Sequence, residues 1–215
     1  MAWLTLVLAS SNEGKLRELR VLLADLPVQV LGVSEVLGRV LPVAETGSSF
    51  EENAILKAQA VCHATRLVSL ADDSGLEVSA LGGRPGVRSA RFAHERATDA
   101  ENNAALLREL EQVAPPERTA RFRCVLSLAT PYSPHVKCVE GSCSGVIART
   151  PRGGGGFGYD PLFLVDGHAG RSMAELSEPE KNAVSHRGQA VRALRPLVTD
   201  LVRELLEQAS TAVPG

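Results

Sequence analysis

The sequence of 215 residues has no marked excess of either charge. Lysine and arginine number 23 against 25 aspartate and glutamate residues, so the formal net charge is −2 at pH 7. A protein that binds duplex nucleic acid usually presents a basic face to the phosphates. The charge balance therefore argues against a nucleic-acid partner. It leaves room for a small phosphate ligand, for which a few local cations suffice.

Long apolar runs are also missing. No segment approaches the roughly 18 consecutive apolar residues that a membrane-spanning helix needs. The first segment, MAWLTLVLASSNEGK, has no basic region of the kind that opens a signal peptide. We therefore expect no membrane partner and no secretory leader, and we expect a cytoplasmic protein.

The four cysteines form no C-x-x-C motif. Cys138 and Cys143, in CVEGSC, could make a local disulfide or half of a metal site. Separate reduced thiols are far more common in a cytosolic protein, and we expect them here.

What the chain does contain is the pattern of an α/β protein. A continuous apolar run at 4–9, a helical repeat at 15–26 and a second apolar run at 28–33 predict strand, helix and strand in that order. No internal repeat and no linker interrupts the sequence, so we expect one domain over residues 1–215, in which two lobes surround a central cleft. Further strands are expected at 67–71, 76–81, 118–130 and 162–165, with one strand, or two joined by a short turn, at 136–148. Further helices are expected from Ser48 or Ser49, and from Thr98, Ser177 and Ser185.

Two adjacent acids in LVSLADDSGLEV raise a question. Asp72 and Asp73 end an apolar strand, and Ser74-Gly75 predicts a turn after them. Neighbouring side chains on a strand point to opposite faces, so the two acids should not share one task. Periodicity does not decide which of them faces a cleft. An acid here could bind Mg²⁺, or it could bond the backbone of a local turn.

Two other segments indicate a phosphate ligand. ASSNEGK places free backbone N–H groups and Lys15 at the start of a helix, which is a typical anion site. It lacks the spacing of a P-loop, and an ordinary turn capped by Asn12 would look the same. Lys57 interrupts the apolar stretch AILKAQA, so its ammonium either reaches solvent or faces a polar cleft.

The glycine run in GGGGFGYDP is followed by aromatic residues, which suits a mobile loop that stacks a ring on a planar ligand. A surface loop with one core aromatic is the alternative. In EKNAVSHRGQA, Lys181 and His186 would not share the face of one unbroken helix. They converge if the helix breaks at Ser185, where Arg187 adds a further cation.

Five blocks carry a family resemblance, in order from Ser10 to Ala190: SSNEGKLREL, ETGSSFEENAILKA, ADDSGLEVSALGGRPGVRSARFA, GGFGYDPLF and SHRGQA. They resemble the inosine/xanthosine triphosphate pyrophosphatases of the Ham1-like family. One departure is that many members have Thr-Gly-Asn or Thr-x-Asn where this chain has Ser-Ser-Asn. Ser10 keeps the hydroxyl.

The resemblance implies a long mixed β-sheet with flanking helices, two lobes around a cleft, and a homodimer. It implies hydrolysis of ITP, dITP or XTP to the monophosphate and pyrophosphate with Mg²⁺. By position, Asp73 would be the general base and a metal-associated acid, and Glu45 the second metal-linked acid. The phosphates would contact Ser10, Ser11, Asn12, Glu13, Gly14, Lys15, Lys57 and Ser74. The purine ring would contact Phe157, Gly158, Tyr159, Asp160, Lys181, His186 and Arg187.

Two other functions fit parts of the sequence. A Maf-type nucleotide pyrophosphatase also begins with a LAS strand, but a Ser-Pro-Arg-Arg turn follows there and SNEGK follows here. A nucleotide sensor without catalysis would keep the cations and lose the metal-linked acids, whereas Glu45 and Asp73 are both present.

Overall fold

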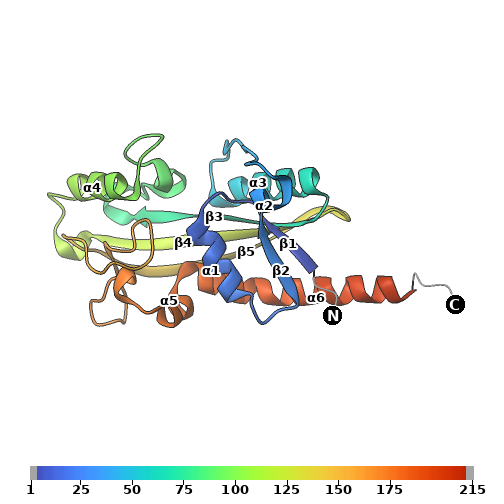
Figure 1. Cartoon of the computed structure of the whole chain (residues 1–215). Helices are drawn as coiled ribbons and strands as arrows, with labels where there is room; N and C mark the ends of the chain where they lie inside the picture. The colour runs from blue at the N-terminus through green and yellow to red at the C-terminus, as the bar shows by residue number, and fades with distance from the viewer. Residues whose placement is uncertain (1–3, 212–215) are drawn as a thin grey trace.

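A mixed sheet of six strands forms the centre of the molecule, in the order β2-β1-β3-β4-β5-β6 (Figure 1). The structure is a computed structural model that describes residues 4–211, with side chains up to residue 208. β1 pairs in parallel with β2 and β3, and the remaining pairs are antiparallel. The expected mixed α/β sheet with flanking helices is confirmed. The strands are β1 Leu4–Leu8, β2 Val28–Gly32, β3 Val68–Val78, β4 Thr119–Thr130, β5 Ser133–Ile147 and β6 Phe163–Val165.

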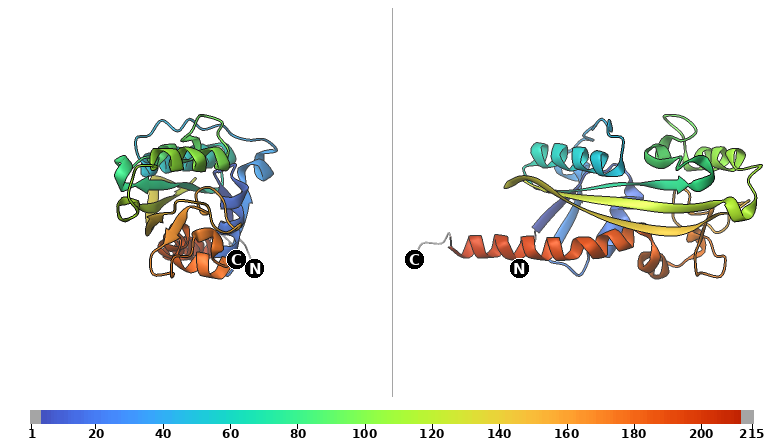
Figure 2. Two further views of the ribbon diagram at one scale, coloured as in Figure 1. Left: turned by 90° about the vertical axis from the view of Figure 1, so that its left-hand side faces the viewer. Right: turned by 180° about the vertical axis from the view of Figure 1, so that it is seen from behind.

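Helices cover both faces of the sheet. α3 and α4 lie on one side, and α5 and α6 lie on the other (Figure 2). Both α4 and α5 are at the end of the molecule away from β1 and β2 (Figure 1). The helices are α1 Glu13–Leu22, α2 Val33–Leu37, α3 Phe50–Thr65, α4 Asp99–Glu109, α5 Glu178–Val184 and α6 His186–Thr211. No helix within residues 4–211 is both long enough and apolar enough to cross a membrane.

The predicted helix starts are confirmed by their caps. Asn12 Oδ1 accepts a hydrogen bond from Lys15 N at 3.0 Å, and Thr98 forms a reciprocal capping box with Glu101. Ser185 ends α5, and its Oγ accepts from Gly188 N at 3.1 Å in the first turn of α6. The predicted break at Ser185 therefore exists, and it changes the direction of the chain between Lys181 and His186.

Three apolar clusters fill the spaces between sheet and helices. The first packs α1 and α6 against β1 and β3, the second fills the end with α4 and β6, and the third lies under α3. β3 contributes Leu70 to the first cluster and Leu76 to the second. The polar residues 72–74 lie between these two positions, so the polar side chains of β3 are at the boundary between the first and second clusters.

The predicted turn at Ser74-Gly75 is wrong. β3 runs unbroken from Val68 to Val78, and its ladder with β4 continues through Gly75, which pairs with Arg123. Glycine is needed here for another reason: a Cβ at Gly75 would lie 2.4 Å from Ser89 Oγ. The segment Gly86–Arg91 packs directly on the strand, so the glycine permits a close approach instead of a turn.

Two smaller expectations are also settled. The segment around CVEGSC belongs to the single strand β5, and residues 79–81 form a short 3₁₀ turn instead of a strand. All four cysteines, which lie within the described residues, are free thiols in this structure.

Candidate active site

The two adjacent acids of β3 point to opposite faces of the sheet. The carboxylate of Asp72 is fully buried on the side of α1 and α6, where it pairs with Arg187 Nε at 2.6 Å and Lys15 Nζ at 2.7 Å. The carboxylate of Asp73 lies on the side of α3, where Lys57 Nζ is 2.5 Å from its Oδ1. The two acids therefore have different partners and different environments.

The pKa values of the two acids differ for the same reason. Burial would raise the pKa of Asp72, but the charges of Arg187 and Lys15 outweigh it and hold that pKa well below its usual range. Burial raises the pKa of Asp73, and the neighbouring Lys57 offsets this only in part. The two cations therefore favour the ionised form of Asp72, whereas the carboxylate of Asp73 has the stronger affinity for a proton.

Lys57 connects Asp73 to a third acid. Its Nζ lies 3.1 Å from Glu45 Oε1, and Arg91 Nη1 donates to the other oxygen of Glu45 at 2.9 Å. Burial opposes ionisation of Glu45, but the charges of Lys57 and Arg91 lower its pKa. Glu45 lies in the loop before α3, and this loop is attached to the helix because Asn53 Oδ1 accepts from Gly47 N at 2.8 Å.

These groups line one cavity of about 330 Å³. Its lining includes Ser10, Ser11, Asn12 and Lys15 from the first turn, and Asp73 and Ser74 from β3. Arg91 is a cation that the sequence analysis did not assign to the site, although it lies within the GVRSARF block. Its guanidinium adds a third positive charge beside Lys15 and Lys57, which suits a polyanionic ligand. The cavity is lined by Ala9, Ser10, Ser11, Asn12, Lys15, Val33, Val40, Leu41, Val43, Glu45, Lys57, Val61, Asp73, Ser74, Val87, Ala90 and Arg91.

A second cavity of about 110 Å³ adjoins the first and shares Asn12, Lys15, Ser74 and Ala90 with it. Phe157 forms part of its wall. The ring of Phe157 lies against the first turn of α1, because a Cβ at Gly14 would be 2.8 Å from its Cδ1. Its lining also includes all the other residues that the sequence assigned to the purine ring: Gly158, Tyr159, Asp160, Lys181, His186 and Arg187.

The cations of this second cavity already have protein partners. Glu18 of α1 pairs with Lys181 Nζ at 2.7 Å and with Arg187 Nη1 at 2.5 Å. Lys181 also pairs with Asp160 Oδ2 at 2.6 Å. An oxygen of a ligand therefore competes with Glu18 for these donors. Sequence reasoning missed Glu18, although its spacing of three residues from Lys15 places both on one side of α1.

His186 is buried and uncharged. Its ring stacks on Phe122 with a centroid distance of 4.7 Å, and its Nδ1 has no hydrogen-bond partner in the described part of the chain. Burial and the nearby Arg187 charge hold its pKa well below the usual range. As a neutral imidazole it can offer one N–H and one acceptor nitrogen, so it is not a cationic contact.

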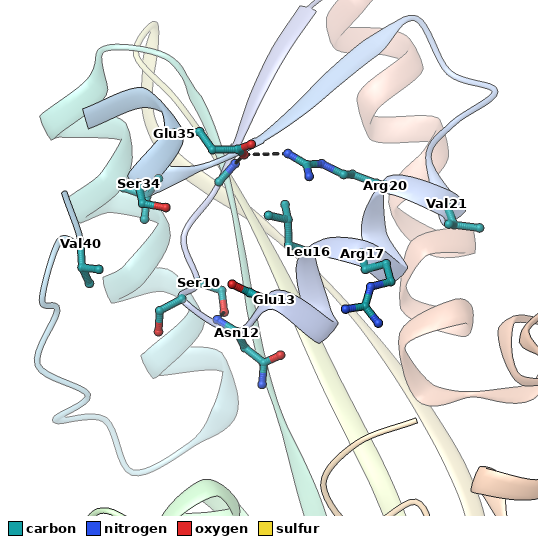
Figure 3. Close-up of a pocket in the computed structure, with 13 residues that line it drawn as sticks. Ser10, Asn12, Glu13, Leu16, Arg17, Arg20, Val21, Ser34, Glu35 and Val40 are labelled. Atoms are coloured by element: carbon teal, nitrogen blue, oxygen red, sulfur yellow. Dashed lines mark hydrogen bonds and ion pairs between the residues drawn. The ribbon is translucent and has the colours of Figure 1, made fainter. Parts of the chain in front are cut away.

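A third cavity, of about 600 Å³, lies on the outer side of the Ser10–Lys15 turn (Figure 3). Arg20 and Glu35 bridge its far wall at 2.6 Å. Among the three cavities, Glu13 borders only this outer one, so the structure does not bring it to the predicted phosphate contacts.

Tyr159 is 4% exposed, and its hydroxyl donates to Ser89 O at 2.8 Å.

The acids of the first cavity fit a divalent cation that is shared with a ligand. The part of the chain whose side chains are described contains no group of three or more His, Cys, Asp or Glu residues placed to hold a metal ion. Mg²⁺ commonly takes only one or two carboxylates and fills its shell with phosphate oxygens and water. Glu45 and Asp73 supply two carboxylates at the cavity, and Asp73 Oδ2 accepts no hydrogen bond from the described residues.

A mixed sheet with a cleft that is lined by two acids, Glu45 and Asp73, and by three cations is typical of α/β enzymes that act on phosphate compounds. The model of the Ham1 family matches residues 6–197, and the chain belongs to this family.

Several relatives agree with this assignment. The dITP/XTP pyrophosphatase of Geobacillus kaustophilus is 50% identical over 189 residues, which cover 88% of this chain and 91% of the relative. That of Nitratidesulfovibrio vulgaris is 51% identical and covers 90% and 95%. The solved structure of a HAM1 protein from Coxiella burnetii has a TM-score of 0.82 and 46% identity, with coverage of 92% and 99%. The Staphylococcus aureus Ham1 protein has a TM-score of 0.79 and 42% identity, with coverage of 91% and 98%.

Proposed function

We propose that this protein hydrolyses dITP, ITP and XTP to the nucleoside monophosphate and pyrophosphate, and so removes noncanonical purine nucleotides from the nucleotide pool. The observation that carries the proposal is the pair of adjoining cavities. One has three cations and two acids for a metal-bound polyphosphate, and the other has an aromatic ring and polar groups for a purine. Their common wall of Lys15 and Ser74 is where the two parts of one nucleotide would join.

Asp73 is proposed as the general base. In this role it would orient and deprotonate the water that attacks the α-phosphorus, with pyrophosphate as the leaving group. Its raised pKa brings it closer to the range of a proton acceptor, and its Oδ2 is free for a water. Lys57 at 2.5 Å fixes the other oxygen, so the carboxylate has a defined orientation.

Glu45 and Asp73 would hold Mg²⁺, the proposed cofactor. The ion, when bound, would neutralise charge on the phosphates and on the leaving pyrophosphate. Lys15, Lys57 and Arg91 provide positive charge around the same space, and backbone N–H groups at the start of α1 that are not used by the Asn12 cap would provide neutral donors. Catalysis on this scheme is positioning and electrostatic stabilisation, without a covalent intermediate.

Recognition of the purine is proposed to rest on Phe157 and on the donors next to it. Hypoxanthine and xanthine carry a 6-oxo acceptor, whereas adenine carries a 6-amino donor. Lys181 and Arg187 can donate to an oxygen that displaces Glu18, but neither can accept a hydrogen bond from an amino group. An adenine amino group that faces these cations would lack an acceptor, and a buried donor without an acceptor costs about 1–3 kcal/mol, which is a tenfold to hundredfold preference.

Two further proposals concern organisation. One domain over residues 1–215 is supported by β3 and β4, which contribute side chains to all three apolar clusters. The homodimer rests on the family resemblance, and light scattering of the purified protein tests it: a mass of one chain would refute it.

Pyrophosphate release is the experiment that tests the activity. We expect release from dITP, ITP and XTP in the presence of Mg²⁺ and none after chelation. The controls are ATP, dTTP and UTP at equal concentration. Preference for dTTP or UTP would point to a Maf-type pyrophosphatase, and binding of dITP without turnover would point to a sensor.

A further inference from the structure

Two side chains of α4 hold both polar backbone atoms of one glycine in the loop that carries Phe157. Asp99 Oδ2 accepts from Gly158 N at 2.7 Å, and Asn103 Nδ2 donates to Gly158 O at 2.9 Å. Asp99 and Asn103 are four residues apart, so they lie on the same face of the helix. Nothing in the sequence analysis assigned a role to either of them.

The loop is also held from the opposite side of the sheet. Phe157 N donates to Asp160 Oδ2 at 3.0 Å, and the same oxygen pairs with Lys181 of α5 at 2.6 Å. Figure 1 shows α4 and α5 at the same end of the molecule, on opposite sides of the sheet. Gly158 has a φ of 62°, in the left-handed region that glycine adopts readily. The backbone turns at this glycine, between the two attachments.

The geometry matters because Phe157 precedes the glycine directly. Its ring borders the smaller cavity and lies 5.0 Å from Lys181 Nζ and 5.5 Å from the Arg187 guanidinium carbon. The attachment to Asp160 fixes the N–H of Phe157 on one side, and the attachment to α4 fixes the next residue on the other. Between them they determine where the ring stands over the cavity.

We propose that Asp99 and Asn103 are positioning residues for purine binding: they hold the Gly158 turn so that Phe157 faces the ligand. The proposal rests on the proposed function and deepens it, since it assigns to α4 a share in the affinity for the purine ring.

A role confined to helix stability would not require this arrangement. Asp99 in the first turn of α4 would favour the helix dipole without any contact to the loop. Asn103 Oδ1 is buried and accepts no hydrogen bond within the described residues. The side chain is therefore oriented for the bond from its Nδ2 to Gly158 O, although this orientation leaves its oxygen unpaired. Both side chains are explained by the loop they hold.

Kinetics of the full-length protein with dITP test the proposal. Asp99→Ala removes the acceptor, and we expect the KM for dITP to rise roughly tenfold while kcat stays within about twofold. Asp99→Asn keeps an oxygen acceptor without the charge, and we expect it to restore most of the affinity. Asn103→Leu keeps the size of the side chain and removes the donor, and should raise KM as Asp99→Ala does. Equal KM increases in Asp99→Asn and Asp99→Ala would assign the effect to the helix charge and overturn the proposal.

Two further measurements separate positioning from a general loss of structure. In a Phe157→Ala background, Asp99→Ala should add less than about twofold to KM, because the ring that it positions is gone. Amide hydrogen exchange in residues 153–160 should become faster in Asp99→Ala, while exchange in β3 stays unchanged.

An additive effect in the double variant, or unchanged exchange in the loop, would overturn the proposal. The exchange experiment needs no substrate. A wild-type protein without turnover on dITP would therefore refute the proposed function, and the exchange result would still decide whether α4 holds the loop.

Discussion

Asp72 and Arg187, which are 115 residues apart in the sequence, form a buried ion pair that joins β3 to α6. Arg187 Nε lies 2.6 Å from Asp72 Oδ2, and the two residues are 1% and 0% exposed. Because this pair holds Asp72 on the opposite face of the sheet, the adjacent Asp73 is the acid that faces the cleft. The pair also explains why neighbouring carboxylates on one strand do not act as a common metal clamp.

Asp72→Asn should lower the stability of the protein. The substitution removes the charge that compensates Arg187 and Lys15 in a buried site, and the expected loss is about 3 kcal/mol. Urea denaturation measures it. Asp200→Asn is the matched control, because Asp200 forms an exposed pair with Arg203 and should cost less than about 1 kcal/mol. Equal losses in the two variants would contradict the structural role of Asp72.

Asp73→Asn should abolish hydrolysis of dITP and leave the fold intact. Removal of a general base lowers turnover by roughly 10² to 10⁴-fold, whereas the asparagine has nearly the same size and keeps an oxygen toward Lys57. Turnover is measured by pyrophosphate release, and dITP binding by calorimetry. Turnover at the wild-type rate would remove Asp73 as the base. Equal losses of turnover in folded Asp72→Asn and Asp73→Asn would place both acids at the reaction centre.

His186 should make stability depend on pH. Its pKa in the folded protein is well below the usual value, so the unfolded chain binds the proton more tightly. Stability is therefore fully present above the ordinary histidine pKa, and it decreases as pH falls below about 6.5. We expect wild type to lose more stability between about pH 8 and pH 5 than His186→Gln does. The same slope in both proteins would show that His186 is not the titrating group.

Arg118→Leu should lower stability without a change in the chemistry. The Arg118 side chain donates to three backbone carbonyls, those of Leu110, Ile147 and Ala148, at 2.7 to 3.0 Å. Leucine removes all three donors. Leu110 O still accepts from Val113 N, and each carbonyl that is left buried without a partner costs about 1–3 kcal/mol. The melting temperature should fall, while kcat/KM for dITP, measured where the variant is folded, should stay the same. A large fall in kcat/KM would mean that Arg118 affects the cleft.

Arg187→Ala should reduce the preference for ITP over ATP. If Arg187 donates to the 6-oxo group, its loss removes a contact that only the oxo-purine can make, and the ratio of the two kcat/KM values should fall roughly tenfold. Circular dichroism establishes that the variant is folded, because Asp72 and Glu18 also lose a partner. An unchanged ratio would leave Arg187 as a purely structural group.

Interactions between residues close in the sequence were sufficient to predict the helix starts and the alternation of side chains along the strands. Asn12, Ser49 and Thr98 have side-chain oxygens that cap a helix wherever the rest of the chain lies, and all three do so here. Alternation along a strand was sufficient for the opposite orientation of Asp72 and Asp73, because it follows from the backbone itself. The break at Ser185 was equally local, since a serine can end one helix and cap the next.

Only the tertiary structure decided which groups share the cleft. Gly75 continues a strand because Ser89 packs against it, and the sequence around Ser74-Gly75 alone favours a turn. Asp72 is a support because Arg187 reaches it from the last helix, and Asp99 is 59 residues from the glycine that it holds. Capping and alternation depend on residues within a few positions. Charge pairing and close packing depend on distances in space, which arise only when the sheet brings distant segments together.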